Sequence, residues 1–323
     1  MATIASDPGG GGELYEADEA NNLDTGEISE EAERETSEED VVTLRPNTVI
    51  QEQGIYSYRN RSRAQTVVLI GEQKTGKTTL LAALYGLFCK GPVGEYEFVS
   101  SQTLYSFAER NHLALIHPDR ADRTVPVTPR TSIGDSVGYF HLKVRREETV
   151  SEIIISDRSG ETFETARSDT SLLNRLTELA IADRVCFLLD AARLTKLETR
   201  HGYRRIFKQT IRALIDNDMI PKTAALEVVV TKTDRISRVV DERDLSAELA
   251  EYEEELKRDF GNAGFPFDVH RICALPRAAV SMGVVGMTEL VERWVSEPLD
   301  ADIAPVPVYT ALRHIDRLPK IWS

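Results

Sequence analysis

The sequence predicts an α/β fold, a three-layer sandwich of helices on both faces of a mostly parallel sheet with one antiparallel hairpin. Apolar runs typical of buried strands alternate with longer stretches of helical spacing. The first run, residues 66–70, leads through a glycine-containing turn into a helical stretch at 77–88. Two β-like runs, 137–144 and 150–156, have only the polar residues 145–149 between them, which predicts the hairpin.

Length and charge limit the classes of function. A chain of 323 residues with 41% hydrophobic content can form one large α/β domain with additions. The net charge is -14, but residues 1–40 alone hold 14 acidic residues and one arginine. The rest of the chain is therefore nearly neutral, and its composition gives no support for nucleic-acid binding through a basic surface.

Composition also divides the chain. We interpret residues 1–45 as a disordered acidic tail, either a solvating segment or a docking or autoinhibitory one, followed by a lead-in at 46–65. The main domain is expected at 66–298, with an insertion around 90–130, and residues 299–323 form a C-terminal extension.

The cysteines and the hydropathy pattern favour a cytoplasmic protein. Cys89, Cys186 and Cys273 are isolated, and three cysteines are an odd number for a disulfide framework, which fits a reducing compartment. No signal peptide is evident, and no apolar run approaches the ~18 residues that a transmembrane helix needs.

Residues 71–79 contain the strongest motif, Gly-x4-Gly-Lys-Thr, between a predicted strand and a predicted helix. Gly71 and Gly76 allow backbone torsions that let consecutive N-H groups point at phosphate oxygens. Lys77 is placed to reach the β- and γ-phosphates, Thr78 can offer its hydroxyl to Mg2+, and the helix adds its positive dipole end. The residues expected to bind the phosphates are Gly71, Gln73, Lys74, Thr75, Gly76, Lys77, Thr78 and Thr79.

The insertion and the hairpin come next. Gly91 and Pro92 end the first helix, and the insertion contains an apolar stretch at 96–99 and a helical pattern at 104–116. A polar loop at 117–136 precedes the hairpin.

The second hairpin strand ends in Asp157, and Gly160 follows in an Asp-x-x-Gly spacing. A carboxylate at that strand end can hold Mg2+, directly or through water. The backbone N-H of Gly160 can approach a γ-phosphate, so the segment after it can be ordered by a bound triphosphate.

The remaining elements complete the alternation. We predict helices at 170–182, 200–216 and 287–295, strands at 185–190 and 226–230, and a helix at 242–260 that is either a solvated surface helix or a partner face.

The strand at 226–230 runs into Thr231, Lys232 and Asp234, a Thr-Lys-x-Asp motif. The Asp234 carboxylate can accept hydrogen bonds from N1-H and N2-H of guanine, whereas adenine offers no such pair of donors. The stem of Lys232 can cover the base while its ammonium reaches the loop backbone. The motif therefore favours guanine.

In this order, the three motifs resemble those of the Ras-like (TRAFAC-class) P-loop GTPases, over residues 66–295. A fourth, weaker match at 271–275 implies that Ala274 donates its N-H to guanine O6, with Cys273 where the family usually has Ser. More narrowly, the loop and the Asp-Arg-Ser-Gly-Glu run are similar to bacterial double-GTPase proteins, which are associated with conflict and anti-phage systems.

The resemblance implies further site residues. A switch threonine that contacts Mg2+ and the γ-phosphate should precede the hairpin, with Thr131 as first choice and Thr128 as second. Arg130 beside it can act as an arginine supplied in cis. Glu161 stands where a water-positioning Gln is common, so we expect slow intrinsic hydrolysis.

The leading hypothesis is a GTP-binding, Mg2+-dependent hydrolase that acts as a molecular switch for protein effectors or activators, with no nucleic-acid partner. Two alternatives are a noncatalytic guanine-nucleotide-binding scaffold and an ATP-using P-loop NTPase.

Overall fold

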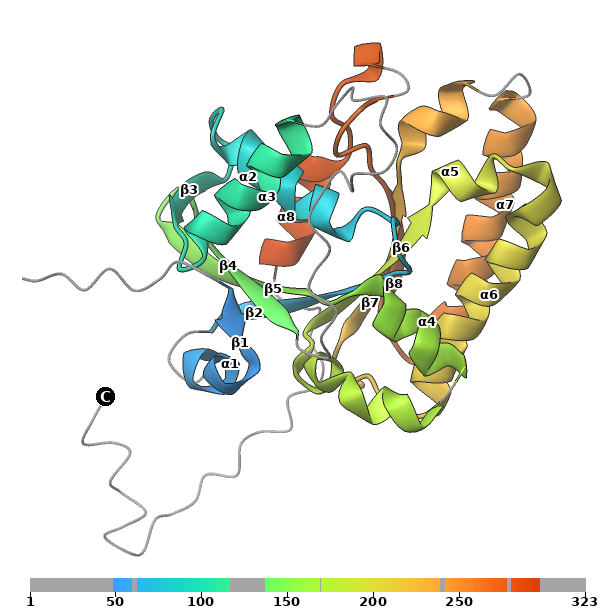
Figure 1. Ribbon diagram of the computed structural model, residues 1–323, viewed down its shortest axis with the longest axis horizontal. Helices are drawn as coiled ribbons and strands as arrows, with labels where there is room; N and C mark the ends of the chain where they lie inside the picture. Colours follow the sequence, from blue (N-terminus) through green and yellow to red (C-terminus); the bar gives the residue numbers. More distant parts are fainter. Residues whose placement is uncertain are drawn as a thin grey trace, which may run out of the picture. The chain divides into compact units, whose positions relative to one another are not determined.

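The fold is a three-layer α/β/α sandwich around one eight-stranded sheet. A computed structural model describes residues 49–59, 63–116, 137–168, 170–238, 242–277 and 280–296. The sheet has the order β1-β4-β5-β2-β6-β7-β8, and β3 pairs with β4 off this path (Figure 1). The strands are β1 (Ile50–Gln51), β2 (Gln65–Ile70), β3 (Glu97–Ser100), β4 (Gly138–Arg146), β5 (Thr149–Asp157), β6 (Arg184–Asp190), β7 (Ala225–Thr231) and β8 (Phe267–Arg271).

Helices cover both faces of this sheet. The α-helices are α1 (Glu52–Arg59), α2 (Lys77–Phe88), α3 (Leu104–Ile116), α4 (Gly160–Ser168), α5 (Ala191–Leu194), α6 (Leu197–Asp216), α7 (Glu242–Gly261) and α8 (Met287–Val295). Short 3-10 turns are η1 (Thr170–Arg175), η2 (Thr177–Ile181), η3 (Thr233–Arg238) and η4 (Val280–Met282).

The sheet is parallel from β5 through β2, β6 and β7 to β8, and the hairpin β4–β5 supplies its antiparallel part. The parallel strands are apolar and buried, as expected for strands covered on both faces. Their carboxyl ends meet at one edge, which brings residues 71, 157, 190 and 231 to the same end of the sheet. Ligands of open parallel sheets bind at this edge.

Along its side next to β4, the sheet is completed by two segments that lie outside the motifs. β1 comes from the lead-in and pairs with β4 at Gly138 and Tyr139, whereas β3 comes from the insertion and pairs with β4 at Lys143 to Arg145. Of the lead-in, Ile50–Gln51 thus joins the sheet, and Glu52–Arg59 forms α1.

Each face of the sheet has its own core. One core lies between the sheet and α6, α7 and the 3-10 turns, and the other lies under α2, α3 and α8. Burying one Leu or Phe side chain contributes roughly 1.5–3 kcal/mol, so these two layers are the main source of stability. On α6 the buried side chains repeat every three or four residues, at Tyr203, Phe207, Ile211 and Leu214.

Two predictions about helices need correction. Residues 170–182 form two 3-10 turns instead of one α-helix, because the buried side chains Leu173, Leu176 and Leu179 recur every third residue, the period of a 3-10 helix. The helix at 242–260, α7, is amphipathic and packs on the sheet. Its buried side chains are Leu245, Leu249, Tyr252, Leu256 and Phe260.

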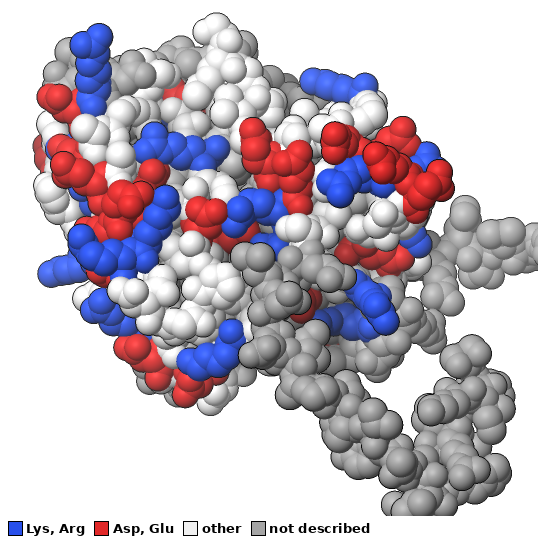
Figure 2. Space-filling view, turned by 180° about the vertical axis from the view of Figure 1, so that it is seen from behind, with Lys and Arg blue, Asp and Glu red and all other residues white. Residues whose placement is uncertain are grey.

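The surface carries mixed charge. Basic and acidic side chains are interleaved on the face shown in Figure 2. Ion pairs join α6 to α7, for example Arg200 to Glu248 at 2.8 Å and Lys208 to Asp259 at 2.5 Å. Within the described residues, no helix is both long enough and apolar enough to span a bilayer. The predicted tail at 1–45, the loop at 117–136 and the extension at 299–323 lie outside the described residues.

Candidate functional site

The loop between β2 and α2 has the backbone that its motif predicts. Gly76, the residue before α2, has φ 110°, and Lys74 has φ 63°. Residues other than glycine rarely adopt such angles, so Lys74 is a strained position. Thr75 Oγ1 donates to the Glu72 carbonyl at 2.9 Å, and Thr231 Oγ1 donates to the Thr75 carbonyl at 2.7 Å. Thr231, the last residue of β7, therefore holds the backbone of the loop in place.

Lys77 is buried at the first position of α2 and points back over the loop. Its Nζ donates to the Gly71 carbonyl at 2.5 Å and to the Glu72 carbonyl at 3.2 Å. Burial lowers the pKa of Lys77 to about 8, although the Asp157 and Glu164 carboxylates act to raise it. An ammonium held this way can exchange loop carbonyls for phosphate oxygens, which also stabilise its charge.

The start of α4 packs directly against the loop. Gly160 is the contact point: the backbone of Glu72 and Gln73 lies where a Cβ on Gly160 would be. Any larger residue at position 160 would push the two segments apart. The Asp-x-x-Gly spacing therefore places the N-terminus of α4 against the phosphate loop.

Carboxylates of α4 hold the interior of the loop. The Gln73 N-H donates to Glu164 Oε1 at 2.9 Å, and the Gln73 side-chain amide donates to Glu161. A backbone N-H of this loop is the type of group expected to bind a phosphate, and here a carboxylate accepts from it. The Gln73 side chain thus faces Glu161, and the Lys74 side chain is exposed.

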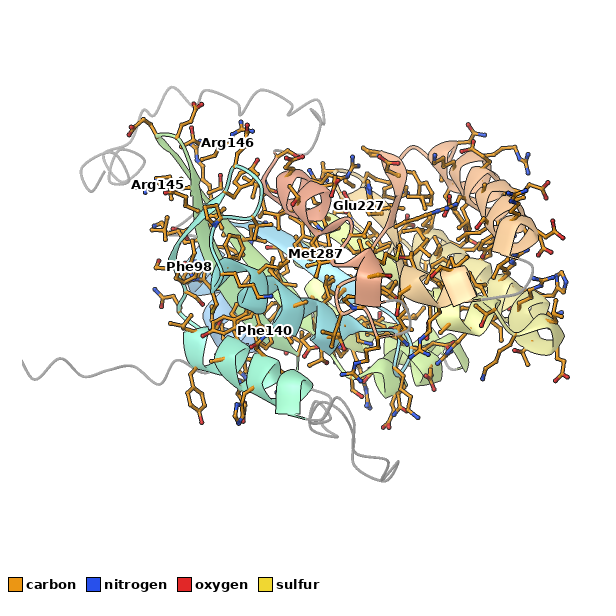
Figure 3. The ribbon with its side chains drawn as sticks, turned by 90° about the horizontal axis from the view of Figure 1, so that it is seen from above. Phe98, Phe140, Arg145, Arg146, Glu227 and Met287 are labelled. Carbon is orange, nitrogen blue, oxygen red and sulfur yellow. The ribbon has the colours of Figure 1, made fainter. Side chains whose placement is uncertain are left out.

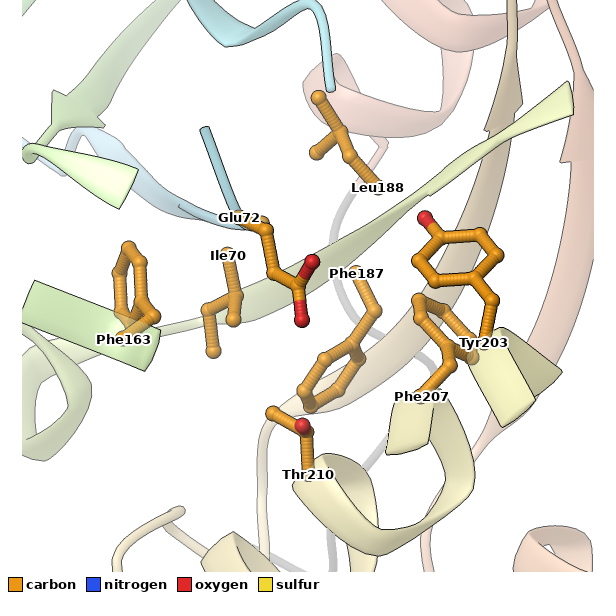
Figure 4. A pocket seen from close by; sticks show the side chains of 9 residues that line it. Ile70, Glu72, Phe163, Phe187, Leu188, Tyr203, Phe207 and Thr210 are labelled. Carbon is orange, nitrogen blue, oxygen red and sulfur yellow. The ribbon is translucent and has the colours of Figure 1, made fainter. Parts of the chain in front are cut away.

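Arg193 of α5 holds the loop from the other side. Its guanidinium pairs with the Glu72 carboxylate and donates to the Gln73 carbonyl at 2.8 Å. Figure 4 shows the Glu72 side chain pointing into a small pocket between Phe187 and Tyr203. Of the larger side chains in the loop, Glu72 thus contacts α5 and Gln73 contacts α4, whereas Lys74 is exposed.

The predicted metal ligands lie beside the lysine. Asp157 at the end of β5 is 1% exposed, and Thr78 and Thr79 lie half-buried in the first turn of α2. Within the described residues, no three His, Cys, Asp or Glu side chains gather into a metal cluster. One buried carboxylate and one hydroxyl suit Mg2+, which takes few protein ligands and completes its shell with water and substrate phosphates.

The base motif follows β7. Lys232 has φ 58°, and its Nζ contacts Asp190 Oδ2 at 2.7 Å and donates to the Lys74 carbonyl. This lysine therefore spans from the base motif to the phosphate loop. Asp234 is 2% exposed and accepts from the Arg277 N-H at 3.0 Å.

Backbone bonds fix the surroundings of Asp234. Thr233 Oγ1 donates to the Ile272 carbonyl at 3.1 Å, and the Cys273 N-H donates to the Val285 carbonyl at 2.9 Å. Burial and then the Asp234 charge raise the pKa of Cys273 to about 11, so its thiol stays neutral. Ala274 is half-buried beside it.

The structure thus brings the described site residues to one edge of the sheet, and their roles stay predictions. Thr131, Thr128 and Arg130 lie outside the described residues. The sequence interpretation missed Asp190, Arg193 and Glu164. Asp190 carries the signal that identified Asp157, an aspartate closing an apolar strand, whereas the other two have no motif.

Comparison with known proteins identifies the family. The sequence profile of the Double-GTPase 2 family matches residues 65–295. No curated protein sequence matches the chain.

Among solved structures, the chain is similar to translation elongation factor SelB from Methanococcus maripaludis in complex with the GTP analogue GppNHp. The TM-score is 0.37 with 14% identity, over 73% of this chain and 35% of that one. For Methanosarcina barkeri Roco2 RocCORdC bound to GDP the TM-score is 0.36 with 12% identity, over 73% and 51%. The chain therefore spans between a third and about half of these two proteins.

A third similar structure is the signal recognition particle receptor SRb-GTP/SRX complex from Chaetomium thermophilum. Its TM-score is 0.38 with 17% identity, over 66% of this chain and 92% of that one. Since the family profile covers well over half of the sequence, the protein belongs to the Double-GTPase 2 family of P-loop GTPases.

Proposed function

We propose that the protein binds GTP with Mg2+ and hydrolyses it to GDP and phosphate as a molecular switch. The observation that carries this proposal is the bridge formed by Lys232. Its ammonium joins the Lys74 carbonyl of the phosphate loop to Asp190, while its backbone belongs to the base motif. One nucleotide can therefore contact both motifs at once.

At the phosphate end, the chain supplies the positive groups. Lys77 lies over the loop at the N-terminus of α2, where the helix adds its positive dipole end. Thr78 and Asp157 would hold Mg2+, which when bound neutralises charge on the phosphate oxygens.

At the base end, Asp234 gives the preference for guanine. Its buried carboxylate accepts from the Arg277 N-H with one oxygen. A carboxylate has room for further donors, so it can also accept from N1-H and N2-H of guanine. Adenine presents no such pair of donors, and a buried carboxylate facing it would stay poorly solvated.

Glu161 is the residue of this chain placed to orient water. It lies in the first turn of α4 and contacts the Gln73 side chain. A carboxylate can accept a hydrogen bond from water, but its charge lies near the γ-phosphate. Slow intrinsic turnover follows from that repulsion.

The switch follows from the partners of α4. Glu161 and Glu164 bond the loop at Gln73, and anionic phosphates would compete with them for the same donors. Binding of GTP would therefore release α4 from Gln73 and change the surface that a protein effector or activator meets.

The direct test is phosphate release from Mg2+-GTP by the full chain, with Lys77→Ala as control. Release that requires Lys77 supports the hydrolase. Tight guanine-nucleotide binding without release in any condition supports the noncatalytic alternative instead. Displacement of labelled GTP by excess GTP but not by ATP is expected, and equal displacement by ATP would contradict the assignment of Asp234.

A further inference from the structure

Helix α3, which comes from the insertion, brings an arginine to the phosphate end of the site. The Arg110 guanidinium lies 3.9 Å from Asp157 Oδ2, and its side chain is 13% exposed. It also lies over the ring of Phe140, 5.8 Å from the centroid. Phe140 lies on the face of the sheet that α2 and α3 cover (Figure 3). None of the nucleotide-binding motifs contains this residue.

Arg110 differs from a neighbouring arginine that is fully used in holding the fold. Arg158 follows Asp157 directly and makes two short bonds to Glu178, at 2.6 and 2.7 Å. Arg110 instead makes its two ion contacts, to Asp157 and to Glu109, at 3.9 Å each. Its Nε has no hydrogen-bond partner within the part of the chain that the structure describes.

The Arg110 guanidinium is largely shielded from solvent, and its ion contacts are long, so its N-H groups can still donate to a ligand. Desolvated charges without short partners are costly, and an arginine that donates to phosphate oxygens in its planar fork geometry recovers that cost. Asp157 lies 3.9 Å from Arg110 and interacts with the charge of Lys77, so Arg110 lies beside the two residues assigned to Mg2+ and to the terminal phosphate.

We propose that Arg110 is a further catalytic residue, which contacts the terminal phosphoryl group of bound GTP and stabilises its charge during hydrolysis. The inference rests on the proposed GTP site. In that reaction a water oxygen bonds to the terminal phosphorus, the bond from this phosphorus to the bridging oxygen breaks, and its electron pair leaves with GDP. The water proton goes to phosphate or solvent, and Arg110 transfers none.

The position of α3 explains how the residue is held. Asn111 donates to the Ala82 carbonyl of α2 at 2.8 Å, and Phe107 packs edge-on against Phe140 at 4.8 Å. These contacts fix the helix on both sides of Arg110. Helix α3 of the insertion therefore holds Arg110 in a fixed position beside Asp157.

The test compares Arg110→Ala and Arg110→Lys with Tyr105→Phe, a change at an exposed side chain of the same helix. Single-turnover phosphate release should fall about 100- to 1,000-fold in Arg110→Ala, the range found for removal of a charge-stabilising donor. Arg110→Lys should recover only part of the rate because it lacks the fork of donors. Tyr105→Phe should keep the wild-type rate.

A binding measurement separates catalysis from structure. Arg110→Ala should bind GDP as wild type does but bind GDP with aluminium fluoride, which mimics the transferring phosphoryl group, at least tenfold more weakly. Equal loss of both affinities, or a lowered melting temperature without this selective loss, would overturn the proposal and assign Arg110 a structural role. An unchanged rate and unchanged fluoride affinity would overturn it too.

The wild-type protein tells the two proposals apart. If it binds GTP without releasing phosphate, the hydrolase proposal fails, but the contact of Arg110 is still tested by the affinity for a nonhydrolysable GTP analogue relative to GDP. A ratio that falls in Arg110→Ala supports the contact, and a constant ratio contradicts it. A wild-type protein that binds no guanine nucleotide would overturn both.

Discussion

The two ends of the nucleotide site are built in different ways. At the phosphate end, which comprises residues 71–79 with Asp157 and the first turn of α4, charged side chains hold one another and the loop. At the base end, which comprises residues 231–234 and 272–277, backbone groups and hydroxyls make most of the contacts around the Asp234 carboxylate, and the Lys232 ammonium pairs with Asp190. On the proposed function, a bound anion would make the phosphate end exchange partners, whereas the base end would keep its contacts.

The difference assigns separate tasks to the two ends. Most bonds at the base end are already formed, so we expect this end to provide selectivity without rearrangement. A network of partly buried charges is sensitive to the charge of its ligand, so we expect the phosphate end to respond to whether nucleotide is bound. The predictions below test whether this division holds.

The largest effect is expected for Lys77→Met. Removing the ammonium should weaken GTP and GDP binding at least 100-fold, measured by titration of fluorescent nucleotide. It should also raise the free energy of unfolding of the nucleotide-free protein by about 1–2 kcal/mol, because a lysine whose pKa is lowered to about 8 is an unfavourable buried charge. Lys90→Met, at an exposed lysine, should change neither quantity.

A second prediction concerns Asp234→Asn at the base end. The asparagine oxygen can still accept from the Arg277 N-H, so the protein should fold with its melting temperature nearly unchanged. Guanine nucleotides should bind about 10- to 100-fold more weakly, and ATP should bind no worse than before. Asp218→Asn, at an exposed aspartate, is the control. Loss of ATP and GTP affinity together would mean that the base end also rearranges.

The pH dependence of binding should come from the phosphate end alone. Protonated Lys77 binds phosphates, and its pKa of about 8 in the empty protein means that it loses its charge as the pH rises from 7 to 9. GTP affinity should therefore fall about tenfold over that interval, as expected for one required proton. Cys273, with a pKa near 11, stays neutral throughout.

The comparison of variants makes this test specific. Asp234→Asn should bind more weakly at every pH but keep the same slope. Lys77→Met should lose the slope. A slope that disappears in Asp234→Asn would place the titrating group at the base end instead.

The sequence predicted the fold and the motif-bearing elements better than it predicted the charge network. The helix at 77–88, the closing helix at 287–295 and the hairpin follow from local periodicity, which the structure confirms. Arg110, Arg193 and Glu164 could not be identified in this way. Each acts across more than 45 residues of sequence, and no spacing rule connects it to the loop.

Sequence periodicity also failed where two helical periods compete. Leu173, Leu176 and Leu179 fit a 3-10 turn as well as an α-helical face, and only packing against the sheet decides between them. The paired Glu and Lys side chains of α7 suggested a solvated helix, although the apolar side chains between them anchor it to the core.

The smallest and most specific prediction is that Glu164→Gln binds nucleotide more tightly, by about three- to tenfold. In the empty protein the Glu164 carboxylate accepts from the Gln73 N-H at 2.9 Å, so phosphates must displace it and then meet its negative charge. Glutamine can still accept that bond through its neutral oxygen, but it repels phosphates less and is displaced more easily.

The control is Glu198→Gln, at an exposed glutamate at the start of α6, which should bind as wild type does. Isothermal titration with GDP at two salt concentrations checks the cause: the gain should shrink at high salt, because screening weakens the repulsion that the substitution removes. Weaker binding by Glu164→Gln would mean that the carboxylate preorganises the loop instead of competing with the ligand, and the contrast between the two ends would then disappear.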